Sequence, residues 1–129
     1  MDIKLHNTLS GEKEVFKPLK EGEVSMYNCG PTVYDYAHIG NFRTFIMGDV
    51  LRRIFEYNKF GVAQVMNITD VDDKTIKRSQ AEGVSLETLT RKYEEFFFSD
   101  LTSLHILTPT KTPRATESIP EMISIIEKL

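Results

Sequence analysis

Two strand-length apolar segments, separated by a long helical pattern, constrain the fold of this chain more than any other feature. Residues 23–28 and 62–68 have the length and composition of strands, and the second is nearly continuous apolar sequence, as in a strand covered on both faces. Between them, from residue 38 or 41 to about residue 58, apolar side chains repeat at helical i, i+4 spacing: Phe42, Ile46, Val50 and Ile54. This order predicts a right-handed crossover and a parallel sheet, and therefore an α/β fold.

The remaining pattern predicts an antiparallel hairpin before this unit and three helices after it. The second helix of the chain is expected to be capped by the hydroxyl of Thr69 and to have an acidic first turn. The expected segments are a hairpin in residues 3–16 around a Ser10-Gly11 turn, a second helix from within residues 69–74 to Gly83, a third helix from residue 85 towards residue 105, a loop over 107–113, and a final amphipathic helix that starts within 116–121.

Composition and charge exclude some classes of protein. With 129 residues, 40% hydrophobic and 27% charged, the chain has the composition of one globular domain with a core. Its formal net charge of -3 gives no basic surface for nucleic acid, although an acidic chain can belong to an RNA-binding protein whose basic surface lies elsewhere. The single cysteine excludes an internal disulfide and fits a reducing, cytoplasmic location. No apolar run approaches the roughly 20 residues that span a membrane, and no secretory leader is expected.

A glycine-containing bend between the first apolar strand and the long helix predicts a ligand site. The bend starts with Cys29 and Gly30, and the helix starts near His38 and Gly40. Free backbone N–H groups and the positive end of a helix favour an anion, and His38 adds a donor for a nucleotide phosphate. Gly40 removes a side chain where the backbone would approach that ligand. Cys29 and Thr69 both follow predicted parallel strands, and such sheets bind ligands at the carboxyl ends of their strands.

Four ordered segments resemble the N-terminal part of the cysteinyl-tRNA synthetase family, which belongs to the class I aminoacyl-tRNA synthetases. The segments are residues 27–35 (Tyr-Asn-Cys-Gly-Pro-Thr-Val-Tyr-Asp), 38–41 (His-Ile-Gly-Asn), 67–74 (Asn-Ile-Thr-Asp-Val-Asp-Asp-Lys) and 113–117 (Pro-Arg-Ala-Thr-Glu). The resemblance covers essentially the whole chain and implies a Rossmann-like parallel sheet with flanking helices. It also implies that residues 1–129 are the N-terminal part of a catalytic domain: a hairpin and lead-in over 1–20, a core with the nucleotide-binding motif over 21–105, and a loop and the start of a further helix over 106–129.

The resemblance implies an enzyme that activates L-cysteine with ATP and Mg²⁺ and then transfers cysteine to tRNA(Cys). Cys29 matches a family cysteine that ligates Zn²⁺, whose other ligands would lie outside this chain. Residues 38–41 match the first class I signature, so His38, Gly40 and Asn41 would bind ATP phosphate, and His38 and Asn41 would be catalytic. Five residues fall where the family contacts the amino acid or its adenylate: Gly30, Thr32, Thr44, Asn67 and Thr69.

The chain departs from the broad class I pattern at Asn41, where many relatives have a second histidine. Asparagine can still donate a hydrogen bond to phosphate, but it carries no charge. The sequence contains no Lys-Met-Ser-Lys-Ser-type loop, no second cysteine and no anticodon-binding region, and its last helix has no capping glycine. We therefore expect the chain to be the first part of a longer enzyme and to be inactive on its own.

Several single residues have two interpretations. A lone cysteine such as Cys29 is more often a small buried hydrophobe than a thiolate ligand, and a histidine such as His38 can simply cap a helix. Arg114 is expected either to contact the active site or the tRNA end, or to form an ion pair at the start of a helix. Three carboxylates could ligate magnesium or could be ordinary acidic residues near a helix start: Asp70, Asp72 and Asp73.

Three other functions are compatible with the sequence. A related ligase of mycothiol synthesis, which joins cysteine to an amino sugar, resembles the same N-terminal pattern. A small nucleotidyltransferase of the His-x-Gly-His group would be complete at this size. A non-catalytic domain would bind adenylate or a partner without turnover.

Overall fold

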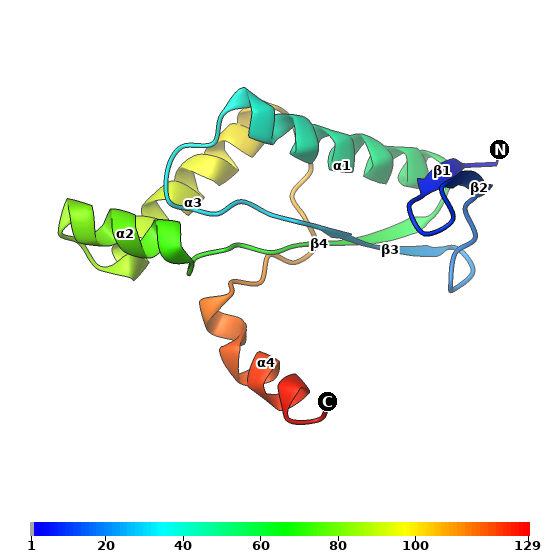
Figure 1. Ribbon diagram of the computed structural model, residues 1–129. Coiled ribbons are helices and arrows are strands. Elements are labelled where there is room, and N and C mark those ends of the chain that lie inside the picture. Colours follow the sequence, from blue (N-terminus) through cyan, green and yellow to red (C-terminus); the bar gives the residue numbers. More distant parts are fainter. Residues whose placement is uncertain (1) are drawn as a thin grey trace.

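Two parallel strands organise the computed structural model, which describes residues 2–129 (Figure 1). β3 (Glu23–Asn28) pairs residue by residue with β4 (Gly61–Met66). α1 (Ile39–Tyr57) connects the two strands and lies along one face of them. The predicted strand–helix–strand unit and its parallel pairing are confirmed, and the chain is an α/β protein.

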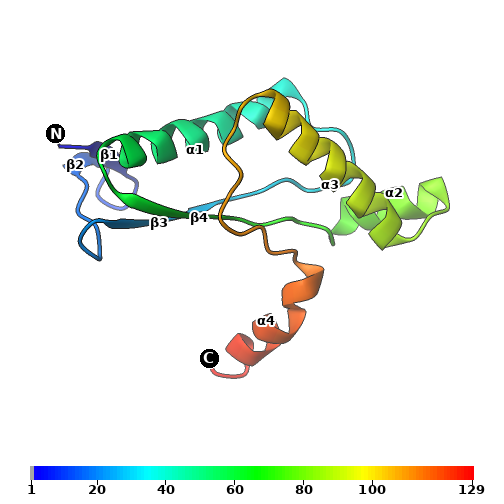
Figure 2. The ribbon, with the colours of Figure 1, turned by 180° about the vertical axis from the view of Figure 1, so that it is seen from behind.

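The helices bury only one face of β4. Gln64 and Met66 are buried, and Met66 packs in one cluster with side chains of α1 and of α3 (Leu86–Ser103). On the opposite face of the strand Ala63 is exposed and Val65 is half-buried. The expectation that this strand is covered on both faces is therefore wrong for the described residues, because α1 and α3 pack on the same face (Figure 2).

Residues 111–115 run beside β4 as a further parallel pairing segment. Its first three residues, 111–113, belong to the loop predicted over 107–113, and that prediction is only partly correct because Lys111 pairs with Val65 of β4. The prolines at positions 109 and 113 lack N–H donors, so the segment does not have the sequence pattern of a strand. Four backbone hydrogen bonds of 2.8–3.2 Å make the pairing: Lys111 N–H to Gln64 C=O, Met66 N–H to Lys111 C=O, Ile68 N–H to Pro113 C=O, and Ala115 N–H to Ile68 C=O.

α2 (Asp73–Glu82) begins at a carboxylate cap. Asp72 accepts hydrogen bonds from the backbone N–H groups of Lys74 (2.8 Å) and Thr75 (2.9 Å). The prediction that Thr69 caps this helix is therefore wrong: the helix starts further along the chain, where an aspartate satisfies its free N–H groups. The predicted end of the helix is confirmed at Gly83, which adopts a left-handed conformation with φ 67°.

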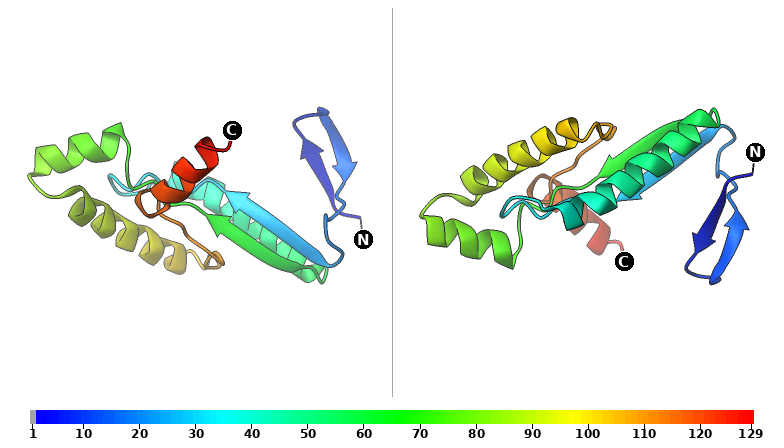
Figure 3. Two further views of the ribbon diagram at one scale, coloured as in Figure 1. Left: turned by 90° about the horizontal axis from the view of Figure 1, so that it is seen from below. Right: turned by 90° about the horizontal axis from the view of Figure 1, so that it is seen from above.

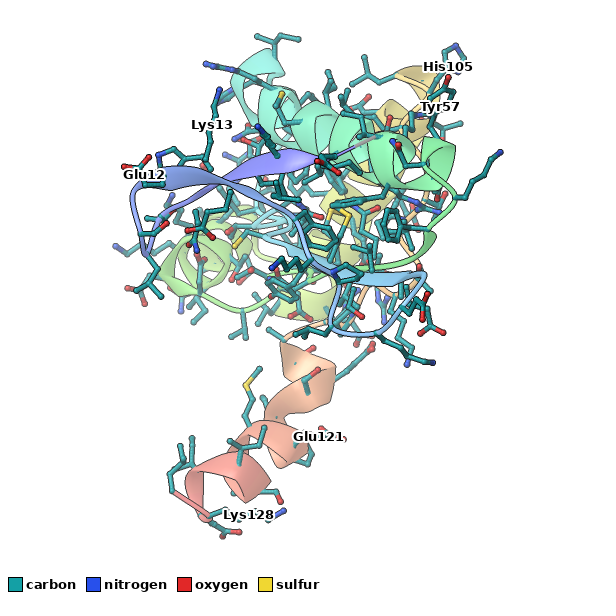
Figure 4. The ribbon with its side chains drawn as sticks, turned by 90° about the vertical axis from the view of Figure 1, so that its right-hand side faces the viewer. Glu12, Lys13, Tyr57, His105, Glu121 and Lys128 are labelled. Atoms are coloured by element: carbon teal, nitrogen blue, oxygen red, sulfur yellow. The ribbon has the colours of Figure 1, made fainter. Side chains whose placement is uncertain are left out.

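The last helices differ in how they pack. α3 begins after Ser85, whose hydroxyl accepts from the N–H of Thr88 (3.0 Å), and it pairs with α2. A short turn of 3-10 helix, η1 (Thr116–Ser118), leads into α4 (Ile119–Ile126), as predicted for the final helix. Figure 4 shows α4, marked by Glu121 and Lys128, standing away from the other elements.

The N-terminal hairpin is confirmed and lies far from the carboxyl ends of the parallel strands. β1 (Lys4–Asn7) and β2 (Glu12–Val15) pair in antiparallel register around a turn that contains Gly11 with φ 75°. Figure 3 shows the hairpin beyond one end of β3 and β4, while α2 and α3 lie beyond the other end. The hairpin therefore takes no part in the site described below.

The core lies under the carboxyl ends of the strands, and α3 contributes to both of its clusters. The first cluster consists of Val33, Ile68, Leu89 and Tyr93. The second consists of Phe42, Met66, Phe97 and Leu101. Because these side chains are closely packed, they hold the region where the strands end in a fixed position.

Candidate functional site

A cleft of about 350 Å³ lies at the carboxyl end of β3, the edge at which parallel sheets bind ligands. Its wall follows the chain from Cys29 through the bend to the start of α1, and residues of α2 and α3 complete it. Six of the predicted site residues line the cleft: Cys29, Gly30, Thr32, His38, Asn41 and Thr44. Three others lie outside its lining: Gly40, Asn67 and Thr69.

His38 caps α1 with its imidazole ring. Its Nδ1 accepts a hydrogen bond from the N–H of Gly40 (3.1 Å), and the Oδ1 of Asn41 accepts from the N–H of His38 (3.0 Å). Because Nδ1 is an acceptor, the neutral ring carries its proton on Nε2. The capping interpretation of His38 is thus correct, and the cap leaves Nε2–H of His38 and the amide NH₂ of Asn41 as hydrogen-bond donors on residues that line the cleft.

Two glycines are required by close approaches within the site. A Cβ at Gly40 would lie 2.9 Å from Cε1 of His38, so this glycine makes room for the capping ring rather than lining the cleft itself. A Cβ at Gly30 would lie 1.6 Å from the backbone oxygen of Asn67, a distance that no side chain tolerates. The bend after β3 therefore touches the chain after β4 directly.

Asn67 and Thr69, which follow β4, are connected to the cleft wall by hydrogen bonds. Oδ1 of Asn67 accepts from the N–H of Gly30 (3.0 Å) and from the hydroxyl of Tyr27 (3.0 Å), while its Nδ2 donates to Oγ1 of Thr69 (3.0 Å). The backbone carbonyl of Thr69 accepts from the N–H of Val33 (3.1 Å). These contacts extend the pairing of the two strands up to the cleft and fix the path of the bend.

Cys29 has an exposed thiol at the edge of the cleft, so it is not a buried hydrophobe. Within residues 2–129 no group of three or more histidine, cysteine, aspartate or glutamate side chains is placed to hold a metal ion. The described residues therefore do not form a zinc site of their own, and Cys29 supplies at most one ligand. Of the three carboxylates considered as magnesium ligands, Asp72 is occupied as the cap of α2.

Arg114 forms a buried ion pair outside the lining of the cleft. Its Nε donates to Oδ2 of Asp70 (3.1 Å), one terminal nitrogen donates to Oγ1 of Thr90 (3.2 Å), and the other contacts Glu94. The N–H of Thr116 (3.0 Å) and its hydroxyl also donate to Asp70. Burial by itself raises the pKa of Asp70, but the hydrogen bonds from Thr116 and Arg114 outweigh it and hold the pKa below its usual value. Of the two interpretations of Arg114, the structure shows the ion pair.

Sequence analysis did not single out several residues that line the cleft. Lys74 could have been found, because it is near the start of a helix that follows the carboxyl end of β4. The aromatic lining residues, such as Tyr36 and Tyr93, could not have been found from the sequence, because their positions depend on the path of the bend and on the packing of α3. The additional polar or charged lining residues are Tyr34, Asp35, Tyr36, Lys74 and Tyr93, and the additional apolar ones are Pro31, Val33, Ala37, Phe45 and Phe97.

The fold and the cleft define an α/β domain with a cleft at the carboxyl end of a parallel strand, the edge at which such sheets bind ligands. A family model described as "tRNA synthetases class I (C) catalytic domain" matches residues 15–129. The chain belongs to this family, and the resemblance seen in the sequence is confirmed.

Similar proteins include several cysteine–tRNA ligases. Those of Brachyspira hyodysenteriae and Methanosarcina mazei are 56% identical over 128 residues and 52% identical over 127 residues, which cover 99% and 98% of this chain. That of Chlamydia trachomatis serovar D is 53% identical over 129 residues, all of this chain. The chain spans about 27% of the length of each of these relatives. None of the helices described in residues 2–129 combines the length and the apolar character that a membrane span requires.

Proposed function

We propose that this chain is part of the catalytic domain of an enzyme that activates L-cysteine with ATP and transfers cysteine to tRNA(Cys). The observation that carries the proposal is that Cys29, His38 and Asn41 line one and the same cleft. Membership of the family over residues 15–129 and the names of the relatives support it. A Rossmann-like arrangement of the complete sheet, with a core over residues 21–105, belongs to the same proposal.

The geometry suits phosphoryl chemistry. In adenylation a carboxylate oxygen of cysteine bonds to the α-phosphorus of ATP, the bond to the bridging oxygen breaks, and pyrophosphate leaves with its electron pair. Negative charge is distributed over the phosphoryl oxygens in the transition state, so fixed donors stabilise it. Nε2–H of His38 is such a donor, held by the cap at Nδ1, and NH₂ of Asn41 is a second one.

The amino acid would occupy the part of the cleft formed by Gly30, Thr32 and Thr44. The same proposal keeps a substrate role for Asn67 and Thr69, although their hydrogen bonds support an additional one, the bracing of the wall. Zinc would require ligands from outside residues 2–129 beside Cys29. It would favour a substrate thiolate over a hydroxyl, because sulfur is the softer ligand. The proposal also includes Mg²⁺, which would enter the site with ATP, and a cytoplasmic location of the protein.

An ATP–pyrophosphate exchange assay on the complete protein that contains this chain tests the proposal. Exchange is expected with cysteine and not with serine or the other amino acids, and cysteine should then be transferred to tRNA(Cys). No exchange with any amino acid would contradict the proposal and favour the non-catalytic domain. Cysteine-dependent exchange with transfer to an amino sugar, and none to tRNA, would favour the mycothiol ligase. Family membership argues against the small nucleotidyltransferase.

The role of His38 is separable from its role as a cap. His38→Asn keeps a good helix-capping acceptor but removes the Nε2–H donor, so the exchange rate constant should fall about 100- to 1,000-fold while the fold is retained. His6→Asn is the matched control, because His6 lies in β1, remote from the cleft, and its loss should leave exchange unchanged. Equal rates for the two variants would remove His38 from the proposed mechanism.

A further inference from the structure

Lys74 places an ammonium group on the wall of the cleft. It is near the start of α2, where the Asp72 cap fixes its backbone N–H (2.8 Å). Its side chain is exposed and lines the same cleft as His38 and Asn41. Nζ lies 5.3 Å from the centroid of the Tyr34 ring. This cation–π contact holds the ammonium group beside the bend that contains Tyr34.

Lys74 has no ion-pair partner within the described residues. No carboxylate in residues 2–129 lies within ion-pair distance of its Nζ. Asp35 is the one acidic residue among those lining the cleft, and it faces Arg78 (3.7 Å). Lys74 is the one lysine or arginine in the same lining, so the cleft has an ammonium group that no described carboxylate holds in an ion pair.

We propose that Lys74 binds a phosphate group of a nucleotide substrate in this cleft, an inference that rests on the proposed function. The cation–π contact with Tyr34 is weaker than a charge-assisted hydrogen bond to phosphate, so the ammonium can exchange one for the other when substrate arrives. Two substrates of the proposed reaction carry such a group. ATP has its triphosphate, and tRNA has the phosphodiester next to its 3′ end. Lys74 and His38 then act on the nucleotide from different elements, the start of α2 and the start of α1.

Four variants of the complete protein test the inference. Lys74→Met removes the charge and keeps most of the apolar length, and Lys74→Arg keeps the charge. Lys77→Met is the matched control, because Lys77 is an exposed lysine on the same helix that does not line the cleft. Lys74→Gln serves as a second neutral variant, and thermal melts of all proteins establish that each is folded.

Two assays identify the source of the phosphate. In cysteine-dependent ATP–pyrophosphate exchange without tRNA, Lys74→Met is expected to raise the KM for ATP about 10- to 100-fold if ATP is the ligand. If tRNA is the ligand, exchange is unchanged and the KM for tRNA in transfer rises by the same factor. In either case Lys74→Arg should recover most of the loss, and added salt should raise the affected KM more steeply for the wild type than for Lys74→Met.

The inference is overturned if Lys74→Met stays within about twofold of the wild type in both assays, or if Lys77→Met shows an equal loss. An active wild type with an unaffected Lys74→Met protein overturns this inference alone. A wild type without any cysteine-dependent exchange overturns the proposed function, and the inference with it.

Discussion

Replacing Arg114 with methionine is expected to destabilise the fold strongly, because the change leaves a buried carboxylate without its cation. The side chains of Arg114 and Asp70 are 5% and 1% exposed, so water reaches neither group freely. Methionine keeps much of the apolar length of arginine, and the effect of the variant therefore comes mainly from the lost charge and hydrogen bonds.

The magnitude follows from what remains around the carboxylate. Removing one partner of a buried ion pair costs about 3–5 kcal/mol. Asp70 keeps two hydrogen bonds from Thr116, and a cavity of about 360 Å³ lined by Asp70 and Arg114 gives room for water beside it. Both features reduce the penalty, so we expect a loss of about 3 kcal/mol, the lower end of that range.

Urea unfolding followed by circular dichroism measures this loss. Arg91→Met is the control, because Arg91 is itself 48% exposed in its pairs with Glu117 (3.0 Å) and Glu94 (3.5 Å), and ion pairs of such an exposed side chain are worth about 0–1 kcal/mol. Asp70→Asn and the double variant complete a cycle, in which a coupling energy of about 1–3 kcal/mol between Asp70 and Arg114 is expected.

The reasoning about the buried pair would be refuted by either of two results. One is a loss for Arg114→Met no larger than that for Arg91→Met. The other is strict additivity of the Asp70 and Arg114 variants, which would mean that the two side chains contribute independently despite their contact.

Two further predictions concern pH and close packing. Because the pKa of Asp70 is lowered in the folded protein, its contribution to stability is present above the unfolded pKa of about 3.9 and is lost as the pH falls through the folded pKa. Asp70→Asn should therefore make the free energy of unfolding depend less on pH on the acid side, as measured by urea unfolding at a series of pH values. The same pH dependence in the variant and the wild type would contradict the prediction. Gly30→Ala should cost about 3 kcal/mol or more in urea unfolding, because its Cβ would lie 1.6 Å from a backbone oxygen. Gly61→Ala, whose Cβ would come no closer than 3.8 Å to the atoms around it, should change stability by less than about 1 kcal/mol, and equal losses would show that the close approach does not matter.

The order of elements could be predicted because it depends on local patterns. The spacing of apolar residues such as Phe42 marks α1, and a nearly continuous apolar run marks β4. The cap of α2 could not be predicted from local patterns, since several oxygen-bearing residues precede this helix and any of them can accept from a free N–H group. Tertiary contacts selected Asp72 and placed Asp70 in the buried ion pair instead.

The candidate site was predictable only where one short stretch of chain supplies it. Cys29 and His38 lie on the same bend, so the sequence places both at the end of β3. Lys74 comes from a different element, and its place in the cleft depends on how α2 packs beside the bend. The bracing by Asn67 depends on a backbone approach of two strand extensions, which no local pattern encodes.

The pairing of β3, β4 and residues 111–115 has a consequence for the order of folding. Each pairing joins segments separated by a helix or more of intervening sequence, whereas α1 and α3 need only local contacts. Chain closure over such separations is slow compared with helix formation. The edge of the sheet that borders the cleft should therefore be the last region to assemble, so that formation of the cleft during refolding lags behind the recovery of helical signal.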